Sequence, residues 1–380
     1  MGTTVGVDEN VLTKLASSAY LPHVTVLDSV EGVGVPAAAV LVAEGTLGFE
    51  NRPQPALLRA DDVLVEVEAC GVCGTDLHIL SDPPAHPATV GIVLGHEIVG
   101  RVHEVGAAVD RPAHGERVAI DPILACGMCA LCRRGHPNLC EDLDALGVFR
   151  DGGLTRFVRV PAPNCHPIGE EVPTALAALS EPLATVMNGL EKVRAVPNEV
   201  AVVLGAGPVG LMWTALLAAA SAVVVIVEPR APRREIALEV GAAAVIDPNA
   251  AEPTGELSAR TGGLGADLAI DATGAAFSEA VRMVRPAGRI VLFGMNSGAR
   301  PQVPQIDITE RELSVIGSFV GKGRFPSAIR ALEHGTPDLA PIISGTWSLS
   351  ELPAALEELR NGDAVKAIIT PDDADGRISG

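Results

Sequence analysis

The chain has 380 residues, of which 48% are hydrophobic and 20% are charged, so it is an ordinary globular protein rather than a disordered one. This length exceeds what one small core accommodates, and two domains are therefore expected. The formal net charge of −19 argues against a nucleic-acid or anionic-membrane surface, because phosphate groups attract clustered Lys and Arg. Neither nucleic acid nor a membrane is expected as a partner.

The N-terminal region carries no basic segment followed by an apolar core, so no secretory signal is expected and a cytoplasmic location is favoured. The longest apolar run, 215–227, is broken by Ser221 and is too short to span a bilayer. Residues 1–36 are interpreted as an N-terminal extension with one short helix at 11–19.

Two kinds of secondary structure follow along the chain. Short strand-like segments separated by Gly and Pro predict a compact antiparallel β domain, and they lie at 39–42, 63–67, 98–105 and 117–120. From Val200, apolar strands alternate with helices, which is typical of a parallel sheet covered on both faces. The strands of this sheet are expected at 201–204, 223–227, 243–246, 268–270 and 289–293.

Four of the seven cysteines lie close together, as Cys126, Cys129, Cys132 and Cys140 in a C-x2-C-x2-C-x7-C pattern. Such density in a cytosolic protein indicates a metal rather than disulfides. Four thiolates close a tetrahedral zinc shell and leave no position for water. The pattern predicts a structural zinc, and four unrelated reduced cysteines are the alternative.

A second metal candidate lies upstream. Cys73 and His96 both occupy glycine-flanked turns, in Gly71-Val-Cys-Gly-Thr-Asp-Leu-His78 and in Gly95-His-Glu97. A lone Cys or His is usually a packed or surface residue, but this pair about twenty residues apart suits zinc.

A strand enters the glycine motif G-x-G-x-x-G at Gly205, Gly207 and Gly210. The first glycine allows the turn, the second allows close approach of a pyrophosphate, and the third allows close helix packing. The helix that begins at Pro208 and Val209 offers its amides to phosphate oxygens. Glu228 follows at a strand end, suits a ribose diol and favours NAD over NADP.

These motifs together resemble the zinc-dependent medium-chain dehydrogenases, the family of alcohol, sorbitol and threonine dehydrogenases, over roughly residues 38–370. The resemblance implies an α/β fold in which a GroES-like β-rich catalytic domain (37–185 and 321–380) is interrupted by a Rossmann domain (186–320). It places the active site in the cleft between the two domains. It also implies two zinc ions per chain and a homo-oligomer, dimeric or tetrameric.

The resemblance assigns a catalytic zinc to Cys73 and His96, with Asp76 orienting the histidine. Its third ligand is either Glu97 or Glu181, the latter in Ser180-Glu-Pro-Leu-Ala184, a motif of sorbitol- and threonine-type members. The resemblance also implies that Thr75 accepts the substrate proton and that His78 relays it through the nicotinamide ribose. Arg233 is implied to hold the adenosine. The nicotinamide half is implied to contact Phe293, Gly294 and Met295.

The expected function is hydride transfer between a nicotinamide cofactor and a secondary alcohol, polyol or amino alcohol, or the matching ketone. The alternatives are a zinc-free quinone or enoyl reductase of the same superfamily and a non-catalytic NAD-binding protein. Both are disfavoured by the presence of two zinc patterns. The substrate itself is not encoded in any motif, and Arg156 fits either an anionic substrate or an ordinary surface salt bridge.

Overall fold

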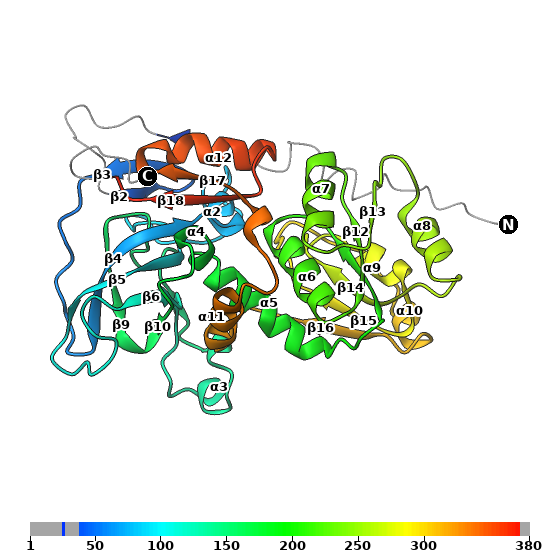
Figure 1. Cartoon of the computed structure of the whole chain (residues 1–380), viewed down its shortest axis with the longest axis horizontal. Coiled ribbons are helices and arrows are strands. Elements are labelled where there is room, and N and C mark those ends of the chain that lie inside the picture. Colours follow the sequence, from blue (N-terminus) through cyan, green and yellow to red (C-terminus); the bar gives the residue numbers. More distant parts are fainter. Residues whose placement is uncertain (1–24, 27–37, 373–380) are drawn as a thin grey trace. The chain divides into compact units, whose positions relative to one another are not determined.

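The computed structural model describes residues 25–26 and 38–372, so the helix expected at 11–19 lies outside the described residues. The described chain forms two compact units (Figure 1), one of residues 192–318 and one of residues before 192 and after 318. The domain limits expected from the sequence stay a prediction. Among the described helices, none is long and apolar enough to cross a membrane.

The unit formed by both ends of the described chain is built mainly of strands. Its strands are β1 (Thr25–Val26), β2 (Ala38–Ala43), β3 (Thr46–Glu50), β4 (Asp62–Gly71), β5 (Glu97–Val105), β6 (Arg117–Ile120), β7 (Ile123–Leu124), β8 (Asp144–Ala145), β9 (Phe157–Pro161), β10 (Cys165–Pro167), β17 (Ile343–Ser348) and β18 (Lys366–Thr370). Seven of them form one sheet in the order β10-β6-β5-β4-β18-β17, with β9 also paired to β4. Strands β4, β5 and β6 pair antiparallel, as the sequence predicts, and β9, which was not predicted, pairs antiparallel with β4.

The same unit contains five helices within its bounds and part of a sixth. They are α2 (Gly74–Ile79), α3 (Ala130–Arg133), α4 (Thr174–Ala177), α11 (Phe325–His334) and α12 (Leu352–Asn361), and α5 (Ser180–Val193) begins here. Short 3-10 turns add η2 (Pro137–Leu139), η3 (Ala162–Asn164), η4 (Ala340–Ile342) and η5 (Leu349–Glu351). Helix α12 packs on β17 and β18, and its buried leucines join the core beneath the sheet.

The strand register of this sheet brings distant parts of the chain together. Gly71, the last residue of β4, pairs with Glu97 of β5 on one side and with Ile368 of β18 on the other. Strand β18, near the C-terminal end of the described chain, therefore lies beside the end of β4, two residues before Cys73. Strand β5, which begins directly after His96, lies on the other side of β4. A pairing this distant in sequence depends on tertiary contacts and leaves no local sequence signal.

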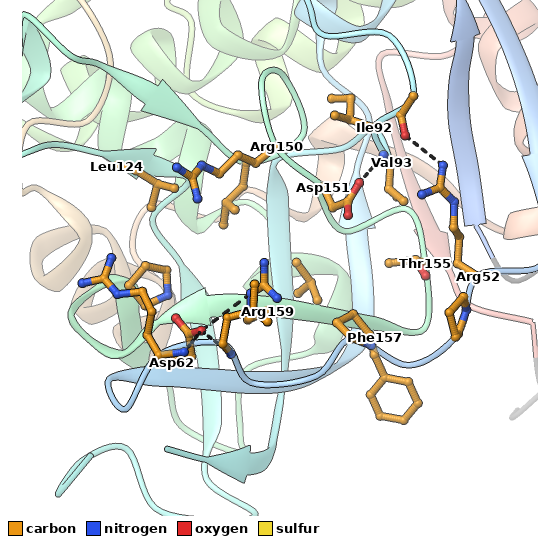
Figure 2. Close-up of a pocket in the computed structure, with 18 of the residues that line it drawn as sticks. Arg52, Asp62, Ile92, Val93, Leu124, Arg150, Asp151, Thr155, Phe157 and Arg159 are labelled. Carbon is orange, nitrogen blue, oxygen red and sulfur yellow. Dashed lines mark hydrogen bonds and ion pairs between the residues drawn. The ribbon is translucent and has the colours of Figure 1, made fainter. Parts of the chain in front are cut away.

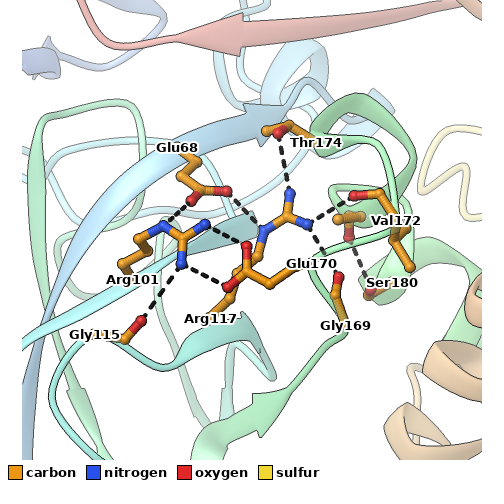
Figure 3. Close-up of polar contacts among 10 residues, drawn as sticks. Glu68, Arg101, Gly115, Arg117, Gly169, Glu170, Val172, Thr174 and Ser180 are labelled. Carbon is orange, nitrogen blue, oxygen red and sulfur yellow. Dashed lines mark hydrogen bonds and ion pairs between the residues drawn. The ribbon is translucent and has the colours of Figure 1, made fainter.

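Figure 3 shows a network of charges that links this sheet to the turn before α4. Arg117 has a side chain only 3% exposed and donates to Glu68 at 2.8 Å. It also donates to Val172 O at 2.7 Å, to Gly169 O at 3.2 Å and to Thr174 Oγ at 3.0 Å. Arg117 therefore ties the turn at 169–174, which leads into α4 and α5, to strand β6.

The unit of residues 192–318 is a parallel sheet with helices. Its strands are β11 (Val200–Leu204), β12 (Val223–Val227), β13 (Ala244–Ile246), β14 (Ala266–Asp271), β15 (Val284–Leu292) and β16 (Ser314–Gly317), and its helices are α6 (Pro208–Ala219), α7 (Ala231–Glu239), α8 (Pro253–Arg260), α9 (Phe277–Met283) and α10 (Gln305–Thr309). The sheet order is β13-β12-β11-β14-β15-β16, all parallel. This order reverses direction next to β11, as in a doubly wound nucleotide-binding fold, and confirms the predicted fold class.

The continuous apolar runs of these strands account for their burial. Strands β11 and β12 are rich in valine, and four of the five residues in each are buried. β-Branched residues suit strands, and strands covered on both faces need no polar alternation. The predicted strand positions agree with the observed bounds within a few residues, most closely for β12 and least for β15, which begins five residues early.

We predict that Arg117→Leu destabilises the protein by about 2–3 kcal/mol, because the buried carbonyl of Val172 loses its donor and the half-buried Glu68 loses one of its two arginines. Urea unfolding measures this loss. Arg101→Gln is the matched control, since Arg101 binds the same Glu68 at 2.7 Å but is 42% exposed. Exposed ion pairs contribute little, so this variant has a much smaller effect. Equal destabilisation by the two substitutions would contradict the role given to Arg117.

Candidate metal and dinucleotide sites

The turn that carries Cys73 is shaped by the start of helix α2. Cys73 is the residue before the first turn of the helix, and its backbone N–H donates to Asp76 Oδ2 at 2.9 Å. Such a side-chain cap satisfies an amide that the helix itself leaves unpaired. Cys73 lies two residues beyond the end of β4, and its sulfur is 3.7 Å from the hydroxyl of Thr75.

Asp76 also lies close to His96. The other oxygen of this carboxylate, Oδ1, lies 3.7 Å from His96 Nδ1, and both side chains are almost fully buried. Burial alone would lower the pKa of His96, but the negative charges of Asp76 and Cys73 raise that pKa well above its usual value. One aspartate therefore caps α2 and places its charge beside the neighbouring imidazole, without a hydrogen bond between Oδ1 and Nδ1.

Glu97 forms a buried ion pair that the sequence did not reveal. Lys366 of β18 contacts Glu97 Oε2, and both side chains are only 1% exposed. Lys366 Nζ also donates to Val72 O at 2.8 Å, one residue before Cys73. Gly71 must be a glycine here, because a Cβ at that position would lie 2.0 Å from Glu97 Oε2.

Cys73, His96 and Glu97 meet with their ligand atoms within 4.8 Å of one another. Glu181, in the first turn of α5, does not belong to this group of three. It is nevertheless buried, and burial raises its pKa to about 8 against the opposing effect of His96. Asp76, Glu97 and Glu181 therefore form a cluster of three buried carboxyl groups near His96, with Lys366 beside Glu97.

His78 lies near the end of α2 and is half-buried. Desolvation and the nearby charge of His86 lower its pKa, so the imidazole is mainly neutral at pH 7. A neutral imidazole offers both a proton donor and a proton acceptor.

The second cysteine cluster has the geometry expected for four thiolates. The sulfurs of Cys126, Cys129, Cys132 and Cys140 lie within 4.8 Å of one another. Backbone N–H groups point at the sulfurs, as from Cys129 to Cys126 Sγ at 3.3 Å and from Cys132 to Cys129 Sγ at 3.4 Å. Hydrogen bonds from the backbone N–H groups of Cys132 and Glu141 lower the pKa of Cys129 to about 6. The lobe consists of α3, η2 and loops, and a metal would supply the cross-link that this small segment otherwise lacks.

The glycine turn after β11 has the three features that a pyrophosphate site requires. Gly205 has φ +98°, a conformation that other residues rarely adopt. A Cβ on Gly207 would meet nothing within 4 Å, which leaves the approach to the helix start open, whereas one on Gly210 would lie 2.0 Å from Gly205 O. Pro208 and Val209 form the first turn of α6.

Glu228, directly after β12, is 5% exposed and accepts hydrogen bonds from backbone amides on both carboxylate oxygens. The donors are Ala206 N at 2.8 Å and Arg230 N at 2.9 Å. Each oxygen keeps a second lone pair for a ribose hydroxyl. Burial lowers the pKa of Arg233, and the nearby Glu228 opposes this shift. Arg234 instead binds Asp247 at 3.0 Å.

Phe293, Gly294 and Met295 follow β15, and Met295 is 50% exposed. The backbone of Gly294 packs against the turn after β14, where a Cβ would lie 2.3 Å from Gly274 N. Strand β14 lies between β11 and β15, so one strand separates Phe293, Gly294 and Met295 from the glycine turn at Gly205.

Two side chains outside the predicted set are clarified by the structure. Lys366 was missed, although a lysine inside the apolar stretch Ala364–Ile369 is itself a signal, because a buried charge requires a partner. Arg156 binds Glu66 at 3.1 Å and lies over the ring of Phe157 at 5.2 Å. Of its two interpretations, the surface salt bridge is the one observed.

Comparison with known proteins gives two family matches. Residues 59–170 match the alcohol dehydrogenase GroES-like domain, and residues 208–334 match the zinc-binding dehydrogenase model. D-Xylulose reductase A of Aspergillus oryzae is 33% identical over 340 residues, covering 84% of this chain and 92% of that protein. Starvation-sensing protein RspB of Escherichia coli K12 is 35% identical over 301 residues, covering 78% and 88%.

Solved structures are similar over nearly the same span. A protein assigned as a zinc-binding dehydrogenase from Sinorhizobium meliloti 1021, bound to NADP, has 32% identity and a TM-score of 0.84, covering 89% of this chain and 100% of that one. An alcohol dehydrogenase (rspB) from Escherichia coli CFT073, complexed with NADH, has 32% identity and a TM-score of 0.81, covering 88% and 99%.

We predict that Lys366→Met destabilises the protein by about 3–5 kcal/mol, because Glu97 is left as an unpaired buried charge. Thermal or urea unfolding of the full chain tests this. The double variant Lys366→Met with Glu97→Gln removes both charges and should recover a large part of the loss. If the double variant is no more stable than the single one, the ion pair is not the source of the effect.

Proposed function

The chain belongs to the zinc-dependent medium-chain dehydrogenases, and we propose that it transfers hydride between a polyol-type secondary alcohol and NAD. The observation that carries the proposal is the meeting of the ligand atoms of Cys73, His96 and Glu97, with the buried Glu181 nearby. Two zinc ions per chain are proposed, one here and one in the four-cysteine lobe.

The residues around Cys73 fit a catalytic zinc. The thiolate and the imidazole are preferred zinc ligands, and a carboxylate, from either Glu97 or Glu181, would complete three protein ligands. Bound zinc would supply a Lewis acid that polarises the substrate oxygen and lowers the pKa of an alcohol. Asp76 is proposed to attract the Nδ1 side of His96, and Lys366 restrains the Glu97 side chain through their ion pair.

Two residues of α2 are proposed to carry the proton. Thr75 lies beside the Cys73 sulfur, so its hydroxyl is available to accept a proton from a substrate hydroxyl there. His78, one turn further along the helix, is neutral at pH 7 and able to take up that proton and release it. Removal of the proton before hydride departure is the step that these two side chains promote.

NAD is proposed to bind at the glycine turn, with its pyrophosphate at the N-terminus of α6 and its adenosine ribose on Glu228. A buried carboxylate repels a 2′-phosphate, which supports NAD over NADP. Arg233 is proposed to cover the adenosine, and Phe293, Gly294 and Met295 to contact the nicotinamide half. The relatives themselves include one structure with NADP and one with NADH.

The substrate class is proposed from the relatives. Several are named D-xylulose reductases, which interconvert a ketose and a polyol. The carboxylate-rich metal set supports the same branch, since Glu181 stands where classical alcohol dehydrogenases have a cysteine. A zinc-free reductase remains disfavoured because both metal clusters are assembled.

Metal analysis tests the zinc assignments. We predict about two zinc ions per purified chain and about one for Cys73→Ala, because loss of the thiolate removes one ligand of three. NAD reduction by polyols should fall to background in that variant while its circular dichroism is unchanged. Cys126→Ser, by contrast, should lower stability as well as zinc content. Retained activity in Cys73→Ala would reject the mechanism.

Initial rates with polyols, amino alcohols and hydroxy acids test the substrate and the cofactor. We predict that polyols give the highest kcat/KM and that NAD is preferred to NADP. Glu228→Ala should reduce the preference for NAD, mainly through KM, because the ribose hydroxyls lose their acceptor. A wild-type enzyme that prefers NADP would contradict the role of Glu228 without affecting the metal assignment.

A further inference from the structure

A cavity of about 640 Å³ lies in the β-rich unit, on residues that belong to neither metal cluster. Its walls come from the loop between β3 and β4, the segment at 90–93, the loop at 146–151 and strand β9. Figure 2 shows this pocket, with Arg52, Asp151 and Val93 together in one part of it and Arg159 and Asp62 in another. A cavity of this volume is large enough for a small organic ligand.

The charges in the wall are mostly positive, in a chain whose net charge is −19. Four arginines, Arg52, Arg59, Arg150 and Arg159, face two carboxylates. All four arginines have an acidic partner, which is Glu50 for Arg52, Asp61 for Arg59, Asp144 for Arg150 and Asp62 for Arg159. What a ligand can use is therefore the N–H groups that these pairs leave unbonded.

The two acidic residues of the wall are already satisfied by backbone donors. Asp62 Oδ2 accepts from Leu58 N at 3.0 Å and from Arg59 N at 2.9 Å. Asp151 Oδ1 accepts from Val93 N at 3.0 Å. Backbone N–H groups offset part of a carboxylate's charge, so these groups repel an anion less than free carboxylates would.

Arg150 and Arg159 retain donors for a ligand. Arg159 donates from Nη1 to Ala56 O at 3.0 Å, and its Nε lies 3.7 Å from an oxygen of Asp62. Arg150 donates from Nε to a carboxylate oxygen of Asp144. Within the described chain, Nη2 of Arg159 and both terminal nitrogens of Arg150 make no hydrogen bond to protein. Guanidinium groups with free terminal N–H bonds bind carboxylates and phosphates well.

The rest of the wall is apolar, and part of it is exposed. Leu58 and Val90 are 72% and 48% exposed, although both are large hydrophobic residues. Leu124, Leu146 and Val158 line the interior. Exposed apolar side chains that border a charged cavity suit a ligand with a hydrocarbon part and an anionic end.

From this combination we propose that the cavity binds an amphipathic organic anion, with its carboxylate or phosphate group on Arg150 and Arg159 and its hydrocarbon part against Leu58 and Val90. The site is separate from the proposed hydride-transfer chemistry and does not rest on it. It requires no metal and no nicotinamide cofactor.

Isothermal titration calorimetry of the zinc-loaded full chain with octanoate and with octyl phosphate tests the proposal. We expect saturable binding of at least one of the two, and the stronger one identifies the preferred anionic group. Arg150→Gln should weaken it by about tenfold through loss of a charge-assisted hydrogen bond. The separate variant Val90→Asp should weaken binding by more than Arg150→Gln does, because it places a negative charge at the rim of the cavity. Arg260→Gln, an exposed arginine of α8 paired with Glu256, is the matched control and should bind as the wild type does.

Two outcomes would overturn the proposal. One is no saturable binding of either probe up to about 1 mM. The other is binding that neither Arg150→Gln nor Val90→Asp changes, which would locate the anion elsewhere, as at the metal. Zinc content and NAD reduction are measured on the same variants, and both should be unchanged in Arg150→Gln. Failure of the anion-site proposal is therefore distinguishable from failure of the proposed enzymatic function.

Discussion

The buried ion pair between Lys366 and Glu97 constrains the whole β-rich unit. Two charges at 1% exposure are tolerated only when each has its partner. Lys366 enters on β18, after the chain has completed the parallel sheet, and Glu97 begins β5. The pair therefore forms only when the C-terminal strand has returned to β4, and it holds the backbone of Val72 at the same time. Gly71 is the residue that leaves room for this contact.

The proposed metal ligands depend on that constraint and on Asp76. Cys73 lies between the backbone held by Lys366 and the helix capped by Asp76, and His96 lies against the same aspartate. Each candidate ligand is thus positioned by a neighbour that is not itself a ligand. A shell arranged in this way orients the site before a metal or substrate arrives, so little reorganisation is needed on binding.

Much of this organisation was predictable from local patterns. The four-cysteine spacing and the glycine turn at Gly205 act over a few residues, so their geometry follows from their sequence. The apolar strands of the parallel sheet were predicted for the same reason. Arg117 and Lys366 were not predicted, since their partners lie 49–57 and 269 residues away in the chain. The choice between the two interpretations of Arg156 likewise required the cross-strand position of Glu66.

The sequence by itself determined the family, the two cysteine-containing metal motifs and the dinucleotide turn, because each is a short pattern whose chemistry is local. Only the tertiary structure decided that Glu97 comes close to Cys73 and His96, and Glu97 and Glu181 both stay proposed as the third ligand. Glu97 joins their ligand atoms within 4.8 Å, whereas Glu181 lies buried outside that group. That decision is made by strand register and by the return of β18, which bring together residues that the chain keeps far apart. The arginine pocket arises in the same way, from four segments that share no motif.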